Sequence, residues 1–178
     1  MRSILITGAN RGIGLGLVKH CLSRGDLVFA ACRSPEQATE LNRLQEAHGD
    51  HLHVFPMDVT NQTAMDNAVA MIKAFTGGRL DILFNNAGVG GGKSPLGSVT
   101  ADELVTAFQV NAVAPLHLAQ SCLPLLKKGD RPVIVNITSR MGSIADNGSG
   151  GSYAYRASKA ALNMLNKSMA IDLASEGI

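Results

Sequence analysis

A tyrosine and a lysine near the C-terminal end of the sequence could move a proton. The stretch YAYRASKAALNML covers residues 153–165, and Lys159 comes four residues after Tyr155 and six after Tyr153. Helical geometry puts Tyr155 and Lys159 on one face, about one turn apart, and Tyr153 on another. If a Tyr–Lys pair works here, Tyr155 is the donor. Taken alone, the pair is better explained by an ordinary surface helix, because two residue types at this spacing often arise by chance.

A glycine-rich stretch near the N-terminus has the residues that phosphate binding requires. Residues 7–14 read TGANRGIG, with Gly8, Gly12 and Gly14 spaced by four and then two. This differs from the common GxGxxG pattern, but the stretch follows an apolar run and opens a helical pattern, which is the context that matters. Glycines allow a pyrophosphate to approach, and the helix N-terminus offers unpaired N–H groups and a positive dipole. A purely structural turn is the alternative.

The next strand-like run indicates which dinucleotide would bind. An NAD enzyme places an acid at its end, about 20 residues after the glycines, to bind the ribose hydroxyls. Here the stretch reads AACRSPE, with Cys32 and then Arg33. No carboxylate stands there to repel a 2′-phosphate, Arg33 could grip it with its planar fork, and Arg11 adds a second cation. The sequence therefore predicts NADP(H) over NAD(H), with solvated arginines as the alternative.

An alternation of strands and helices would position these residues. Short runs rich in Val, Ile, Leu and Phe predict strands, and longer amphipathic stretches predict helices. The strands are expected at 3–7, 27–32, 51–58, 80–85 and 133–137, and the helices at 13–25, 36–47, 61–75, 100–126 and 153–174. Pro115 and Pro124 should bend or shorten the fourth helix.

This order predicts a single α/β domain over residues 1–178, built as a Rossmann-like, doubly wound parallel sheet. No linker, repeat or low-complexity tract divides the chain. The stretches GVGGGKSP and ADNGSGGS follow strands, and ligands bind outside the carboxyl ends of strands in open α/β sheets. These two loops are therefore candidates for the rim of the site.

The composition narrows the classes of protein and partner. A net charge of +2 and an aromatic content of 4% argue against nucleic-acid or membrane binding. Cys21, Cys32 and Cys122 are widely spaced, which fits reduced thiols in a cytosolic protein and offers no zinc motif. His51 and His53 are expected to share one face of a strand, and without a third ligand a solvated or core role is favoured. No metal is expected.

The first residues give no sign of targeting. MRSILITGAN passes from a short apolar run straight into glycines, unlike a signal peptide. No apolar stretch approaches the roughly 18 residues that would cross a bilayer. We expect a cytoplasmic protein.

Several motifs together resemble the short-chain dehydrogenase/reductase family. The resemblance covers essentially all of the chain, and its carbonyl-reductase-like and C-factor-like members are the most similar. The matching stretches, in the family's order, are TGANRGIG (7–14), MDVT (57–60), NNAG (85–88), FQVNAVAP (108–115), NITS (136–139) and YRASK (155–159). Six motifs in register are far more specific than any one of them.

The resemblance implies a catalytic set and reverses the first interpretation of the Tyr–Lys pair. Tyr155 would be the general acid that protonates a carbonyl oxygen, or the base in the oxidative direction. Lys159 would favour the phenolate and hold the nicotinamide ribose. Ser139 would polarise the substrate carbonyl, and Asn111 would hold a water that links Lys159 to solvent.

The resemblance also implies the cofactor contacts. Asp58 would contact the adenine, and the NNAG stretch would bend beside the cofactor, with Asn86 more structural than catalytic and Arg156 pointing elsewhere. The full set of expected cofactor residues is Gly8, Asn10, Arg11, Gly12, Ile13, Gly14, Arg33, Asp58, Val59, Asn85, Ala87, Gly88, Tyr155 and Lys159.

Two departures from the family pattern stand out. Ser139 lies 16 residues before Tyr155, farther than usual, which makes Ser143 a minor rival for the serine role. Family members also continue past the last helix with two more strands and a segment that covers the substrate, whereas this sequence stops at Ile178. The domain is therefore expected to be C-terminally incomplete.

The sequence predicts an NADP(H)-dependent oxidoreductase that interconverts a small carbonyl compound and an alcohol. A nucleotide-binding signalling protein and an inactive fragment of such an enzyme are the alternatives. The family commonly pairs its two long helices between subunits, so a homodimer or homotetramer is expected through 100–126 and 153–174. Both helices carry apolar residues such as Leu104, Phe108, Leu162 and Leu165, some of which must face the sheet instead.

Overall fold

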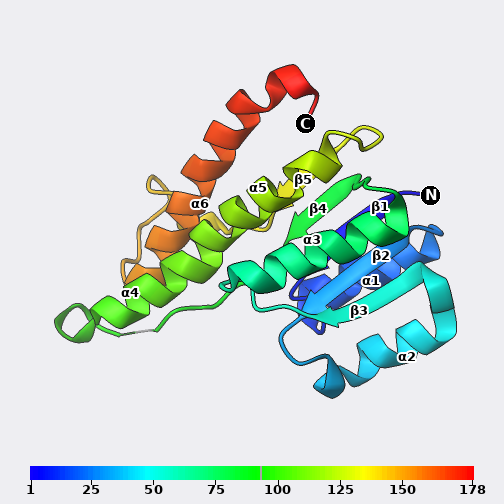
Figure 1. The fold of residues 1–178 in the computed structure, drawn as a ribbon. Coiled ribbons are helices and arrows are strands. Elements are labelled where there is room, and N and C mark those ends of the chain that lie inside the picture. The colour runs from blue at the N-terminus through cyan, green and yellow to red at the C-terminus, as the bar shows by residue number, and fades with distance from the viewer. Residues whose placement is uncertain (93) are drawn as a thin grey trace.

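Five parallel strands form the centre of the molecule (Figure 1). The computed structural model describes residues 1–92 and 94–178, so Lys93 in the GVGGGKSP stretch lies outside the described residues. The strands are β1 (Ser3–Thr7), β2 (Leu27–Cys32), β3 (Leu52–Pro56), β4 (Ile82–Asn85) and β5 (Val133–Asn136). Their order is β3-β2-β1-β4-β5, and every neighbouring pair is parallel. The expected doubly wound sheet is confirmed.

The strand order places a switch point at β1. The chain winds outward from β1 to β3 and then returns to β4 on the other side of β1. In such a sheet the connections diverge at the carboxyl ends of the two central strands, which opens a crevice there. Residues that follow β1 and β4 therefore come together although they are far apart in the sequence.

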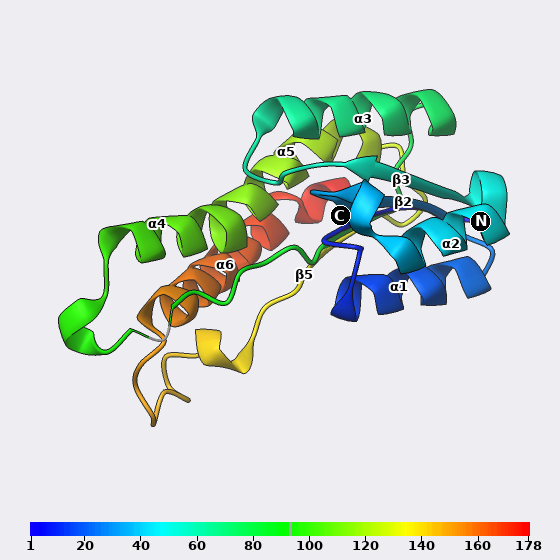
Figure 2. The ribbon, with the colours of Figure 1, turned by 90° about the horizontal axis from the view of Figure 1, so that it is seen from below.

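Helices cover both faces of the sheet (Figure 2). Helices α1 (Gly12–Ser23) and α2 (Thr39–His48) pack on one face, where Val18 and Leu41 join Ile4 and Ile6 of β1 in one apolar core. Helices α3 (Gln62–Thr76) and α5 (Ala114–Leu126) pack on the other face. Burial of apolar side chains on both faces explains why the central strands are nearly continuous apolar runs.

The expected long helix at 100–126 is divided in two. Helix α4 (Ala101–Phe108) passes through a π-helical turn (Gln109–Val113) into α5. Pro115 has no N–H to donate to the carbonyl of Asn111, and a wider turn accommodates the lost bond. Pro124 lies inside α5 without ending it. Thr100 caps α4 with a reciprocal capping box to Glu103.

Helix α6 (Tyr153–Asp172) lies beside α4 in both views (Figures 1 and 2). This contact shows which of the apolar residues named for self-association face inward. Leu162 is only 1% exposed, so it is one of the residues that pack inside the chain. Leu104 and Phe108 are exposed, and Leu165 is half-buried.

Other boundaries differ slightly from the expected ones. The helix expected from Glu36 begins at Thr39, because Pro35–Gln37 forms a 3₁₀ turn first. His51 lies in a 3₁₀ turn before β3, so the expectation that it shares a strand face with His53 is wrong. His53 stacks on Phe29, with ring centroids 5.2 Å apart.

Within the described residues, no helix is long and apolar enough to cross a membrane.

Candidate active site

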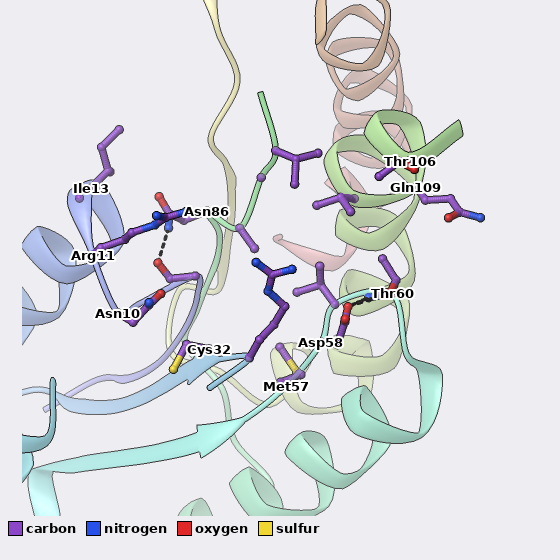
Figure 3. A pocket seen from close by; sticks show the side chains of 18 residues that line it. Asn10, Arg11, Ile13, Cys32, Met57, Asp58, Thr60, Asn86, Thr106 and Gln109 are labelled. Atoms are coloured by element: carbon purple, nitrogen blue, oxygen red, sulfur yellow. Dashed lines mark hydrogen bonds between the residues drawn. The ribbon is translucent and has the colours of Figure 1, made fainter. Parts of the chain in front are cut away.

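A cavity of about 490 Å³ opens at the switch point of the sheet (Figure 3). It is walled by the loops after β1, β2, β3 and β4 and by one side of α4 and the π-helical turn. Many of the residues expected to bind a cofactor line this cavity. They are Gly8, Asn10, Arg11, Gly12, Ile13, Arg33, Asp58, Val59, Ala87 and Gly88. Ten residues spread over four loops thus meet around one space.

The glycine-rich loop is shaped by close backbone contacts. Gly8 has a φ of +62°, and a Cβ on it would lie 2.9 Å from Ala87 Cα. A Cβ on Gly14 would overlap the carbonyl oxygen of Gly8. Gly12, with a φ of +54°, has open space around it and faces the cavity. Gly8 and Gly14 therefore let the loop pack against the end of β4, whereas Gly12 leaves room for a ligand.

The N-terminus of α1 is free to bind an anion. Arg11 occupies its N-cap position, and among the described residues no side-chain cap hydrogen bond forms there. Free N–H groups and the helix dipole favour a phosphate at this point. The loop geometry therefore fits a pyrophosphate.

Asn86 holds the glycine-rich loop to the end of β4. Its Nδ2 donates to the carbonyl oxygens of Thr7 and Gly8, at 2.8 and 3.1 Å. The hydroxyl of Thr7 accepts from the backbone N–H groups of Asn86 and Ala87, each at 3.0 Å. Asn86 also lines the cavity. Its contacts agree with the structural role expected for it.

Two arginines and one aspartate among the lining residues give the cavity its charge. Arg11 and Arg33 are exposed, and among the described residues neither forms a salt bridge. The Oδ1 of Asp58 accepts from the Thr60 N–H and hydroxyl, at 2.9 and 2.7 Å. These two bonds and the positive charge of Arg33 lower the pKa of Asp58. The side chain of Asp58 is thus held as an anion by Thr60, and it lines the same cavity as the two arginines.

Tyr155 and Lys159 form the expected pair on α6. Lys159 Nζ lies 5.8 Å from the centroid of the Tyr155 ring. Lys159 is only 5% exposed, and its Nζ donates to the Ile137 carbonyl at 2.7 Å. Burial lowers the pKa of its ammonium group. Tyr153 is exposed on another part of the helix.

The pair adjoins the cavity through Gly88. Neither Tyr155 nor Lys159 is among the lining residues, but a Cβ on Gly88 would lie 3.8 Å from Lys159 Nζ and 3.1 Å from Asn111 Oδ1. Asn111 is 1% exposed; it accepts from the Val89 N–H at 2.8 Å and donates to the Val89 carbonyl and Ser158 hydroxyl, each at 2.9 Å. Asn111 therefore ties the loop after β4 to α6.

Ser139 and its rival Ser143 follow β5 on the same connection. Ser139 Oγ accepts from the Met141 N–H at 3.1 Å, which leaves its own proton available. Ser143 Oγ accepts from the Asp146 N–H at 3.3 Å and lies in the following loop. Arg156 turns toward that loop and donates to Ser149 Oγ at 2.8 Å.

Two of the expected cofactor residues lie behind the cavity wall. Gly14 packs against Gly8, and Asn85 is buried. Asn85 Nδ2 donates to Asn136 Oδ1 at 2.8 Å and to the Pro115 carbonyl at 3.2 Å. Both residues support the site from within the fold and do not line the cavity.

Besides Asn86, the cavity is lined by residues outside the expected cofactor set. They are Cys32, Met57, Thr60, Val89, Thr106, Gln109 and Val110 (most of them labelled in Figure 3). Cys32, Met57, Thr60 and Val89 neighbour recognised residues and could have been included on that ground. Thr106, Gln109 and Val110 lie on one side of α4 and the π-helical turn, and no sequence signal tells which side faces the cavity. Burial raises the pKa of the Cys32 thiol.

The described residues contain no cluster of three or more His, Cys, Asp or Glu side chains that could hold a metal ion.

Comparisons with known proteins match this geometry. A family model described as short chain dehydrogenase matches residues 2–178. The carbonyl reductase Sniffer of D. melanogaster is 43% identical, with a TM-score of 0.96, over 100% of this chain and 77% of that one. The structure of an NADPH-bound carbonyl reductase from chicken fatty liver is 38% identical, with a TM-score of 0.94, over 100% of this chain and 76% of that one.

A third similar protein bears on the alternative function. The C-signal of Myxococcus xanthus is 48% identical over 100 residues, which are 56% of this chain and 60% of that protein. The family match, in contrast, spans nearly the whole sequence, and it confirms the resemblance that the six motifs indicated. The chain therefore belongs to the short-chain dehydrogenase family and is an oxidoreductase.

Proposed function

We propose that this oxidoreductase interconverts a small carbonyl compound and its alcohol with NADP(H), using Tyr155, Lys159, Ser139 and Asn111. One observation carries the proposal. Tyr155 and Lys159 stand together behind Gly88, beside a cavity that a glycine-rich loop at a helix N-terminus also lines.

The cavity residues fit a dinucleotide along its length. Gly12 and the first N–H groups of α1 would hold the pyrophosphate. Asp58 and Val59 would contact the adenine, and Lys159 the nicotinamide ribose. When bound, the cofactor supplies or accepts the hydride.

The proton would come from Tyr155. In the reductive direction its Oη donates a proton to the substrate oxygen as hydride reaches the carbonyl carbon, which leaves a phenolate. The Lys159 ammonium stabilises this negative charge in a buried setting where solvent screens it little. In the oxidative direction the phenolate takes the proton back.

Ser139 and Asn111 would support the transfer. The Ser139 hydroxyl only accepts a bond from Met141, so it can donate its own proton to the substrate oxygen and polarise the carbonyl. We propose that Asn111, which joins the loop after β4 to α6, holds the water through which Lys159 exchanges protons with solvent.

The charge of the cavity supports NADP(H) as the cofactor. Arg11 and Arg33 line it, and Cys32 stands where an acid would repel a 2′-phosphate. The similar chicken carbonyl reductase was solved with NADPH bound, which supports the same assignment.

Replacement of the two tyrosines tests the proposal. We expect carbonyl-dependent oxidation of NADPH by the parent chain, and Tyr155→Phe should lower kcat by about 10² or more, the range of general acid catalysis. NADPH binding, followed by calorimetry, should stay nearly unchanged because the ring remains. The matched control Tyr153→Phe should keep most of the activity. Near-parent kcat in Tyr155→Phe, or loss of activity only in Tyr153→Phe, would show that the proton donor is misassigned.

The likeness to C-signal favours one second candidate, a nucleotide-binding signalling protein. Such a protein would bind NADP(H) but would not need an ordered acid, lysine and serine. Tight NADPH binding without NADPH consumption over a panel of aldehydes and ketones would support it against the enzyme.

A further inference from the structure

A single amide side chain on α6 holds the connection after β5 on both sides of Ser139. Asn163 Oδ1 accepts a hydrogen bond from Thr138 Oγ1 at 2.7 Å, and Asn163 Nδ2 donates to the Gly142 carbonyl at 3.3 Å. Thr138 directly precedes Ser139, and Gly142 closes the 3₁₀ turn that Ser139 caps. Asn163 thus fixes the chain immediately before the serine and shortly after it.

Gly142 brings the same turn into close contact with α6. A Cβ on Gly142 would lie 2.9 Å from Asn163 Nδ2, 2.9 Å from the carbonyl carbon of Lys159 and 3.0 Å from Lys159 Cβ. Any side chain there would push the turn away from the helix. The distance between the 3₁₀ turn after Ser139 and Lys159 is therefore set by this close contact at Gly142. The hydrogen bond from Asn163 to Gly142 holds the turn in that contact.

Hydrogen bonds link this face of α6 to the end of β5. Lys159, Asn163 and Asn166 follow one another at helical spacing. Their partners are the last residue of β5 and the two residues after it: Lys159 bonds to Ile137, Asn163 to Thr138 and Asn166 to Asn136. Hydrogen bonds are directional, and only Asn163 among these three residues bonds on both sides of Ser139, so it fixes how the turn lies against the helix.

We infer that Asn163 is a positioning residue, which sets Ser139 relative to Tyr155 and Lys159. The inference rests on the proposed function, in which Ser139 and Tyr155 both reach one substrate oxygen. A displacement of about 1 Å of a catalytic group can lower a rate about 10²-fold. Asn163 acts through Ser139 and the 3₁₀ turn.

Alanine substitutions on α6 give a matched test. Asn163→Ala should lower kcat by roughly 10–10²-fold with little change in KM for NADPH, because the residues that line the cavity are untouched. The control Asn166→Ala removes an amide side chain about one helical turn further along α6, where it bonds to Asn136. This variant should change kcat less than about twofold. Equal losses in the two variants would overturn the inference.

A second pair of variants distinguishes the hydrogen bond of the Thr138 hydroxyl from the volume of its side chain. Thr138→Ser keeps the donor to Asn163 and should retain near-parent kcat. Thr138→Val keeps the volume but removes the donor, and should lose activity. A parent-like rate in Thr138→Val would count against the inference.

A double-substitution cycle with Ser139→Ala distinguishes positioning from general damage. If Asn163 acts through Ser139, Asn163→Ala should cause little further loss once Ser139 is alanine. A loss of the same size in both backgrounds would overturn the inference. An active Ser139→Ala would overturn the serine assignment and this inference with it, whereas an impaired Ser139→Ala beside a fully active Asn163→Ala would overturn only the inference.

Amide hydrogen exchange tests the same contact without turnover. The Met141 N–H bonds to Ser139 Oγ, and the Gly142 N–H bonds to the Ser139 carbonyl. Both should exchange faster in Asn163→Ala and not in Asn166→Ala, while the amides in the middle of α6 stay protected. Unchanged exchange at Met141 and Gly142 would overturn the inference.

Discussion

At the scale of single residues, Lys159 is a buried cation with two proposed roles, one beside Tyr155 and one at the nicotinamide ribose. Its ammonium has three N–H donors, and the Ile137 carbonyl takes one of them. Burial lowers its pKa, so the charge is maintained against a desolvation penalty. Titratable groups with perturbed pKa values gather at functional sites, and the neighbour of Lys159 here is Tyr155.

We therefore expect Lys159→Ala to damage both binding and rate. NADPH affinity should fall by about 1–3 kcal/mol, the scale of a hydrogen bond to a charged group, and kcat should fall as well. Calorimetry and steady-state kinetics would measure the two effects, with the exposed Lys167→Ala as control. A fall in rate with unchanged NADPH affinity would contradict the role of Lys159 at the ribose.

Arg33 should determine the choice of cofactor. The parent chain is expected to bind NADPH more tightly than NADH, and Arg33→Ala should narrow the gap by roughly 1–3 kcal/mol. Arg43→Ala, on the outside of α2, is the control. Calorimetric titration of both cofactors measures the gap, and equal affinities in the parent chain would refute the NADP(H) assignment.

At the scale of elements, Asp81 joins three parts of the sheet. Its side chain is fully buried and accepts bonds from the Ser3 N–H and hydroxyl and from the Asp130 N–H, at 2.7, 3.1 and 2.7 Å. Burial by itself raises the pKa of Asp81, but these bonds and the charge of Arg79 outweigh it and lower the pKa. The starts of β1 and β4 and the loop before β5 thus depend on one carboxylate.

Removal of this carboxylate should destabilise the fold. Asp81→Ala leaves buried N–H groups without an acceptor, and we expect the free energy of unfolding to fall by about 2–4 kcal/mol. Urea unfolding at neutral pH measures it, with the exposed Asp172→Ala as control. A loss no larger than that of Asp172→Ala would contradict the role of Asp81.

The lowered pKa of Asp81 also predicts a dependence on pH. Its contribution should be complete above the pKa of an unfolded aspartate, about 3.9, and should be lost as the pH falls through the lower folded value. Asp81→Asn should therefore flatten the acid side of the stability profile. An acid slope equal to that of the parent would show that other carboxylates account for it.

At the scale of the whole molecule, α4 and α6 form one layer and leave apolar residues at its surface. Leu104, Val105 and Phe108 of α4 and Met164 of α6 are exposed. Leu162 is enclosed between elements of its own chain and cannot contribute to an interface. The remaining residues still fit the self-association that the family resemblance implies.

We expect a homodimer or homotetramer at micromolar concentration, and Phe108→Glu should shift it toward monomer because a charge would enter an apolar contact. Phe75→Ser, at an exposed position of α3, is the control. Sedimentation would measure both. A monomeric parent chain would refute the prediction.

The sequence was sufficient for everything that depends on local pattern. Apolar runs and amphipathic stretches predicted all five strands and the class of sheet, with boundaries that moved by a few residues where turns such as Pro35–Gln37 intervened. The spacing of Tyr155 and Lys159 fixed their common face, because four residues make about one helical turn. The glycines of TGANRGIG indicated a turn between the first strand and the first helix that another group can approach closely.

Only the tertiary structure decided which of these residues share a space. Gly14 and Asn85 belong to quoted motifs but lie behind the cavity wall, whereas Thr106 belongs to none and lines the cavity. The bonds of Asn163 to both sides of Ser139 join segments more than 20 residues apart. Such contacts depend on how a helix is rotated against the sheet, and that rotation follows from packing of the whole core, which no local pattern records.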